Sequence, residues 1–137
     1  MTWVPGDGWT LDVNNARVAV RNLRLLTLSG AVLHLDSASL DTGSGFDLIG
    51  PPHLLDQLVA PDEGQWIHVT TIDGRKAPAR MFEATLEFPG DPMGALAISA
   101  VSLAGADAVL LGLPVLRKFH ICLAPDPIGR SLLRRPS

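Results

Sequence analysis

The sequence has 137 residues, of which 47% are hydrophobic and 18% are charged, and its net charge is -3 at pH 7. This length and apolar content suit one domain with its own core. The negative charge argues against nucleic-acid binding, which requires a clustered basic surface. The only cysteine, Cys122, excludes an intrachain disulfide. The N-terminal residues do not resemble a signal peptide, and no apolar run is long enough to span a membrane, so we expect a cytoplasmic protein without membrane partners.

The first third of the chain shows the two-residue alternation of β-strands. Apolar residues alternate with polar ones on both sides of Ser29-Gly30, which predicts a hairpin that leads into the segment around Asp41. Pro51-Pro52 then precedes several leucines, a pattern typical of a short helix within residues 49–60.

The middle of the chain predicts a long hairpin over residues 66–88. Its tip is Asp73-Gly74, a favoured dipeptide for tight turns. On the return strand, Phe82, Ala84, Leu86 and Phe88 alternate with polar residues, so one face of this strand is expected to be buried.

The last third predicts two more strands over residues 95–101 and 108–112, the second ending in Gly112. A short helix is expected over residues 114–119, because Pro114 suits a first helical turn. A final strand is expected over residues 120–123, before Pro125 and Pro127 interrupt the pattern.

Asp41-Thr42-Gly43-Ser44 is the most specific motif of the chain. Two carboxylates about 3 Å apart share one proton, so one can activate a water while the other protonates a leaving group. In such a loop we expect the Thr42 hydroxyl to fix the backbone, Gly43 to permit the turn, and Ser44 to hydrogen-bond the outer carboxylate oxygen. The alternative is a surface turn, because all four residue types favour turns.

Asp36-Ser37-Ala38 is a weaker rival for the same role. Asp41 is preferred because Gly43 and the apolar pair Leu48-Ile49 follow it at the required distances. Asp36 is expected on the solvent face of its strand.

The tetrad, the hairpin with Asp-Gly at its tip, and the segment Leu110-Leu111-Gly112 followed by a short helix resemble the retropepsin-like (retroviral-type) aspartic proteases in order and spacing. The resemblance covers about residues 22–124 of a single domain, 1–137, with terminal extensions. It implies an all-β, retropepsin-like acid protease fold: a single lobe with a psi loop, a flap hairpin and one short C-terminal helix.

In that family, Leu110, Leu111 and Gly112 would support the psi loop that carries the catalytic Asp41. Ile72, Asp73 and Gly74 would form the flap over a peptide substrate. The position of Ser39, usually apolar in the family, and the single glycine of the flap tip depart from the pattern.

A chain with one tetrad supplies half of a catalytic dyad, so the resemblance implies a homodimeric aspartic endopeptidase that cleaves a peptide or protein substrate. It further implies that residues 120–123 interleave with terminal strands of the partner. We expect no cofactor, and the four histidines show no metal-ligand spacing. A catalytically silent dimeric peptide-binding or scaffolding domain of the same fold, and an unrelated β-barrel binding module, are the alternatives.

Overall fold

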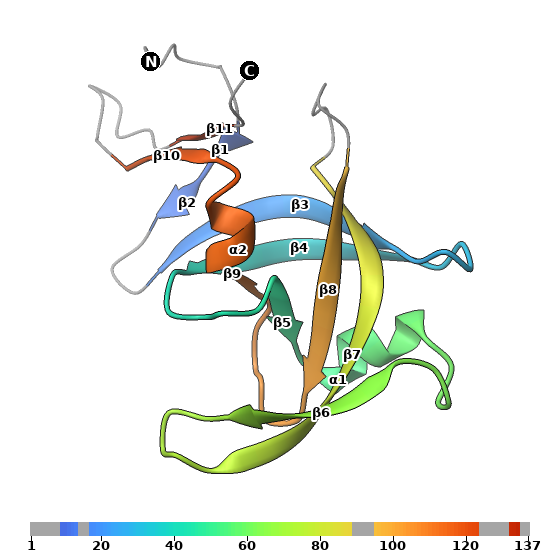
Figure 1. The fold of residues 1–137 in the computed structure, drawn as a ribbon. Coiled ribbons are helices and arrows are strands. Elements are labelled where there is room, and N and C mark those ends of the chain that lie inside the picture. The colour runs from blue at the N-terminus through green and yellow to red at the C-terminus, as the bar shows by residue number, and fades with distance from the viewer. Residues whose placement is uncertain (1–8, 14–16, 89–94, 124–131, 135–137) are drawn as a thin grey trace.

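The structure is a computed structural model that describes residues 9–13, 17–88, 95–123 and 132–134. Strands dominate these residues, and the helices are single turns (Figure 1), so the protein is all-β as the sequence predicts. The strands are β1 (Trp9–Thr10), β2 (Asp12–Val13), β3 (Val18–Leu26), β4 (Val32–Asp41), β5 (Leu48–Gly50), β6 (Gln65–Thr70), β7 (Lys76–Glu87), β8 (Leu96–Leu103), β9 (Leu110–Gly112), β10 (His120–Cys122) and β11 (Leu132–Arg134). The helices are α1 (Pro52–Leu55), a 3-10 helix (Asp56–Leu58) and α2 (Leu113–Leu116).

Six strands of the main sheet form a closed barrel. The sheet has the order β2-β3-β4-β9-β5-β8-β7-β6, and β3 also pairs with β7. This extra pairing joins β3, β4, β9, β5, β8 and β7 into a ring. Strands β2 and β6 lie outside the ring, each at one end of the sheet.

The predicted hairpins are present. β3 and β4 are antiparallel, and the N–H of Gly30 donates to the carbonyl of Thr27 at 3.0 Å in the turn between them. Gly30 has a φ of 90°, a conformation that favours glycine. β6 and β7 form the long hairpin, and residues 71–75 make its tip.

The core follows the alternation seen in the sequence. On β7, Phe82, Ala84 and Leu86 are buried and Glu83 is exposed. The largest fully buried side chains include Leu23, Leu25, Leu48, Leu55, Leu86 and Leu111, which come from five strands or helices of the barrel region. Each such leucine contributes about 1.5–3 kcal/mol relative to an exposed one.

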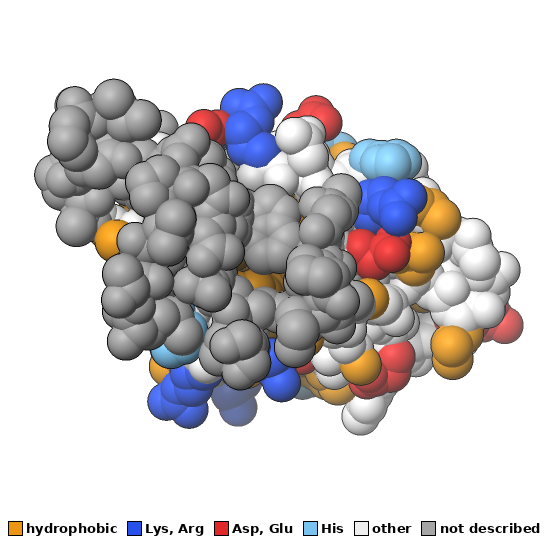
Figure 2. Space-filling view, turned by 90° about the horizontal axis from the view of Figure 1, so that it is seen from above, with side chains coloured by type: hydrophobic (Ala, Val, Ile, Leu, Met, Phe, Trp, Pro, Cys, Tyr) orange, Lys and Arg blue, Asp and Glu red, His pale blue; other side chains and the backbone are white. Residues whose placement is uncertain are grey.

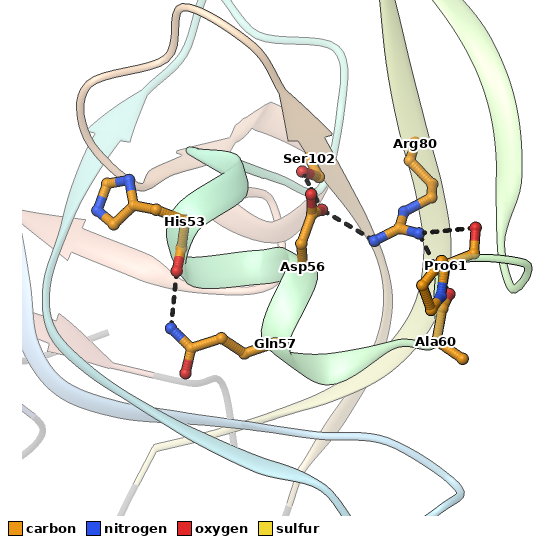
Figure 3. Close-up of polar contacts among 7 residues, drawn as sticks. All are labelled: His53, Asp56, Gln57, Ala60, Pro61, Arg80 and Ser102. Atoms are coloured by element: carbon orange, nitrogen blue, oxygen red, sulfur yellow. Dashed lines mark hydrogen bonds and ion pairs between the residues drawn. The ribbon is translucent and has the colours of Figure 1, made fainter.

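A buried arginine ties the helical segment to the barrel (Figure 3). The Arg80 side chain, on β7, is only 7% exposed and contacts a carboxylate oxygen of Asp56 at 3.0 Å. The same guanidinium donates to the carbonyls of Ala60 and Pro61, and Asp56 also accepts a 2.7 Å hydrogen bond from Ser102 on β8. A buried charge needs such partners. The network therefore fixes the chain between the 3-10 helix and β6.

One of the two predicted helices is shorter than expected. The first lies within the predicted range, at residues 52–58, and begins directly after Pro51. The second spans Leu113–Leu116, not residues 114–119, although Pro114 lies in its first turn as expected. Residues 117–119 continue as turns, with Phe119 buried against Phe88.

The predicted final strand is not the last one. β10 pairs antiparallel with β11, and β11 also pairs with β1. Residues 120–122 therefore have a strand of their own chain along one edge. β1 and β11 lie in the two terminal extensions, which were not expected to form strands, and Leu133 is fully buried there. The interleaving of residues 120–123 with a partner stays a prediction.

One face of the molecule carries charges of both signs. Acidic and basic side chains lie next to one another at the upper edge and on the right of Figure 2. Because charges of both signs are mixed, the described side chains on this face do not produce a strong positive or negative potential.

Candidate functional site: the Asp41 loop and the β6–β7 hairpin

Asp41 is the last residue of β4. Its strand runs parallel to β9, with Ser39 opposite Leu110, Leu40 opposite Leu111 and Asp41 opposite Gly112. β9 pairs on its other edge with β5, antiparallel. The chain therefore leaves β4 at Asp41, loops around, and returns as β5 with β9 inserted between the two strands.

The loop after Asp41 wraps closely over Gly112. The Gly112 N–H donates to the Asp47 carbonyl and the Leu113 N–H donates to the Ser44 carbonyl, each at 2.9 Å. A Cβ atom at position 112 would lie 1.7 Å from the Phe46 carbonyl oxygen. Only glycine fits there, because the loop backbone occupies the place of a side chain.

The Asp41 carboxylate is partly held by its own loop. Oδ1 accepts a 3.0 Å hydrogen bond from the Gly43 N–H, and the Ser44 N–H donates to the Asp41 carbonyl at 3.2 Å. Among the described residues, Oδ2 has no hydrogen-bond partner. Asp41 is half-buried while Thr42 and Gly43 are exposed. One carboxylate oxygen is thus oriented by the backbone, and the other is available to a water or to a second carboxylate.

Two expectations for the tetrad are wrong within the single chain. The Ser44 hydroxyl accepts a hydrogen bond from the Phe46 N–H at 3.3 Å and does not reach the Asp41 carboxylate. The exposed Thr42 side chain makes no hydrogen bond to the rest of the described chain. In this structure the loop is fixed by its backbone contacts to Gly112 and Leu113, not by these two hydroxyls.

The end of the loop is anchored in the sheet. The Asp47 carboxylate accepts a 2.8 Å hydrogen bond from the Ser99 N–H on β8. Leu48 and Ile49 follow as buried residues of β5. Asp47 was not identified from the sequence, because an aspartate between a phenylalanine and a leucine gives no signal that a strand distant in the sequence will donate to it.

The predicted flap is the hairpin of β6 and β7, and its tip lies on the same side of the molecule as the Asp41–β5 loop in Figure 1. Phe46, from that loop, and Ile67, from β6, are both half-buried against a cluster of Ile49, Val69, Ala79 and Val101. This cluster joins the base of the hairpin to the strand that follows the Asp41 loop. Ile72 at the tip is fully exposed.

A carboxylate holds the turn at the tip of the β6–β7 hairpin. Asp73 accepts hydrogen bonds from the Thr71 hydroxyl and from the Arg75 N–H, and Gly74 takes a φ of 82°. The hydrogen bond from Thr71, with that from the Arg75 backbone, holds the pKa of Asp73 below its usual value. The Arg75 guanidinium lies 3.4 Å from Asp73, but both side chains are exposed and their attraction is weak.

The rival aspartate lies elsewhere. Asp36 is exposed on β4, as expected of a residue on the solvent face. Within the described ranges, no three His, Cys, Asp or Glu side chains are grouped so as to hold a metal ion.

No protein-family model matches the chain, and a search of curated proteins finds no match. In the part of the chain that the structure describes, no helix is long and apolar enough to cross a membrane.

The close approach at Gly112 gives a test of the loop. We expect Gly112→Ala to destabilise the protein by about 3 kcal/mol or more, because a methyl group cannot enter a well-packed site without moving backbone. Gly45→Ala, in the same loop, is the matched control, since a Cβ atom at Gly45 meets nothing within 4 Å. Urea unfolding of both variants measures the difference. Equal stabilities would show that the loop does not wrap Gly112 as described.

The lowered pKa of Asp73 at the hairpin tip can be tested. A carboxylate with a lowered folded pKa stabilises the structure above its unfolded pKa, and this stabilisation is lost as pH falls through the lower folded value. We therefore expect the tip to stay closed at weakly acidic pH. NMR titration of the Asp73 carboxyl carbon should give a lower midpoint than in a peptide of residues 71–75. Thr71→Val should raise the midpoint; an unchanged midpoint would contradict the hydrogen bond as its cause.

Proposed function

We propose that the protein is a retropepsin-like aspartic endopeptidase that acts as a homodimer. The observation that carries the proposal is the insertion of β9 between β4 and β5, which wraps the Asp41 loop over Gly112. A surface turn would not need a buried apolar strand ending in an obligatory glycine beneath it. The Asp41 tetrad and the strand β9 beneath it come from segments about 70 residues apart in the sequence. Their contact therefore does not follow from the turn propensity of the tetrad.

The chemistry would require two chains. Asp41 of one protomer would face Asp41 of its partner across a twofold axis, and the two carboxylates would share one proton. The ionised member would take a proton from a water that attacks the scissile carbonyl, while the protonated member donates to the substrate. The orientation of Oδ1 by the Gly43 N–H supports this role, because it turns one oxygen into the loop and leaves Oδ2 available to a second carboxylate.

The β6–β7 hairpin would serve as the flap. An extended peptide would lie between the hairpin and the Asp41 loop, with backbone pairing for affinity and side-chain pockets for selectivity. Closure would exclude water and hold the scissile bond in register. The exposed Ile72 at the tip supports this, since a large apolar side chain in water gains stability when a substrate or a partner flap covers it.

The central test replaces Asp41. Asp41→Asn should reduce peptide hydrolysis below detection and leave folding unchanged, because the substitution is nearly isosteric and removes the ionisable group. Asp36→Asn is the matched control on the same strand and should retain activity. Hydrolysis of a fluorogenic peptide library, with sedimentation to determine oligomeric state, provides the measurement.

The outcomes separate the alternatives. Full activity of Asp41→Asn would refute the proposed mechanism. Tight binding of a pepstatin-type transition-state mimic by a dimer that cleaves no peptide would favour the silent peptide-binding domain. A protein that stays monomeric at high concentration, without hydrolysis, would favour an unrelated barrel module.

A second test addresses the flap. Gly74→Val places a β-branched residue at a φ of 82°, which costs about 1–2 kcal/mol of local strain. We expect lower turnover with little loss of global stability, because the tip is exposed. Gly30→Val, with a φ of 90° in the β3–β4 turn, applies the same strain away from the flap. Comparable loss of kcat in both variants would contradict a specific role of the flap.

A further inference from the structure

A hollow of about 430 Å³ lies against β7. Its floor is residues 81–83 of β7. One wall is residues 27–29, which follow β3, and the other is residues 63–65, which lead into β6. In Figure 1 both walls lie to the right of β7, whereas the flap tip lies on the left.

The hollow occupies a gap in the strand pairing. β7 pairs with β6 as far as Met81, opposite Gln65, and with β3 from Thr85 onward, opposite Leu26. Among the described residues, no strand pairs with Phe82, Glu83 and Ala84 on this edge, although β8 pairs with all three on the other. Backbone groups of successive strand residues point to opposite edges, so at least one of the three directs its N–H and C=O into the gap.

The lining combines apolar surface with negative charge. Leu28, Val59, Met81 and Phe82 supply apolar atoms, and Leu28 is fully exposed. Glu63 and Glu83 supply two carboxylates, and the described lining residues include no Lys, Arg or His.

The positive charge beside the hollow, that of Arg80, already has partners. The aliphatic part of Arg80 lies against Gly64 in one wall, since a Cβ atom at Gly64 would meet Arg80 Cγ at 3.1 Å. Its guanidinium, however, is turned to Asp56 and to the carbonyls of Ala60 and Pro61 (Figure 3). The hydroxyl of Ser99 hydrogen-bonds Glu83 at 3.1 Å and adds no charge. The two glutamates are thus left to attract a cation.

We propose that this gap binds an extended peptide segment in which a lysine or arginine is flanked by apolar residues. The segment would add a short strand to β7 at residues 82–84, a length of about 10 Å. Its apolar side chains would pack on Leu28 and Met81, and its cation would pair with Glu63 and Glu83. The proposal does not rest on catalysis at Asp41, because the gap lies within one chain and away from the tetrad.

The experiment uses the full chain carrying Asp41→Asn, so that hydrolysis cannot remove the probe. The probe is the peptide Gly-Gly-Val-Lys-Val-Arg-Val-amide, labelled with fluorescein at its N-terminal amine so that the lysine keeps its charge, and it is followed by fluorescence anisotropy. We expect saturable binding that weakens with salt and about tenfold weaker binding by the Glu63→Gln, Glu83→Gln double variant, since each partly exposed pair contributes a few-fold. The Asp36→Asn, Asp107→Asn double variant changes net charge equally at exposed sites and should bind normally.

Two further measurements test the position and the pairing. Leu28→Lys introduces a cation into one wall at a fully exposed position, so it should abolish binding without affecting folding. A probe N-methylated at alternate residues should bind at least tenfold less, because it cannot complete the strand. Absence of binding, equal binding of a probe with glutamate in place of lysine and arginine, or NMR shift changes away from residues 82–84 would each overturn the proposal. None of these outcomes bears on hydrolysis by the Asp41 enzyme.

Discussion

The contact between the Asp41 loop and Gly112 is the constraint on which the candidate site depends. The Phe46 carbonyl oxygen lies where a side chain of residue 112 would be, and two backbone hydrogen bonds, from Gly112 and Leu113, hold the loop in that position. These bonds satisfy polar groups that burial would otherwise leave without partners. Since β9 also pairs with β4 and β5, the loop cannot shift without disturbing three strands of the barrel. The position of the Asp41 carboxylate is therefore set by the core, and not by the local preferences of a turn.

β7 organises the rest of the molecule. It pairs with β8 along one edge. Along the other edge its neighbour changes from β6, on the side of the hairpin tip, to β3, near the far end of the barrel. The pairing with β6 lets the hairpin extend beyond the barrel, and the pairing with β3 closes the barrel. The change of neighbour leaves an interruption, which a closed barrel with uniform pairing would not have. The long hairpin and the unpaired segment of β7 are thus two consequences of one long strand that pairs with two neighbours.

The sequence predicted those parts of the fold that depend on local pattern. The alternating pattern on β7 and the turn residues around Gly30 and Gly74 were enough to predict the two hairpins. Both signals depend only on residues that are close together in the sequence. The sheet of β1, β11 and β10 was missed, since two- and three-residue strands carry no periodicity and β1 pairs with β11 across more than 100 positions. Arg80 was missed for a related reason: an arginine on an alternating strand is usually solvated, and its burial depends on Asp56 and on carbonyls of a distant loop.

Within one chain, the hydroxyls of the tetrad do not hold the Asp41 loop. The loop was predicted to be fixed by the hydroxyls of Thr42 and Ser44, yet within one chain its backbone is held by Gly112 and Leu113, and Thr42 projects into solvent. An exposed hydroxyl next to a half-buried carboxylate contributes little to the stability of a monomer. It can contribute once a second copy brings the same loop opposite, because the hydrogen-bonding groups of Thr42 and the Oδ2 oxygen would then face their symmetry mates. The unfilled hydrogen-bonding capacity of the tetrad is thus consistent with a site that is completed between chains, which is what the proposed dyad requires.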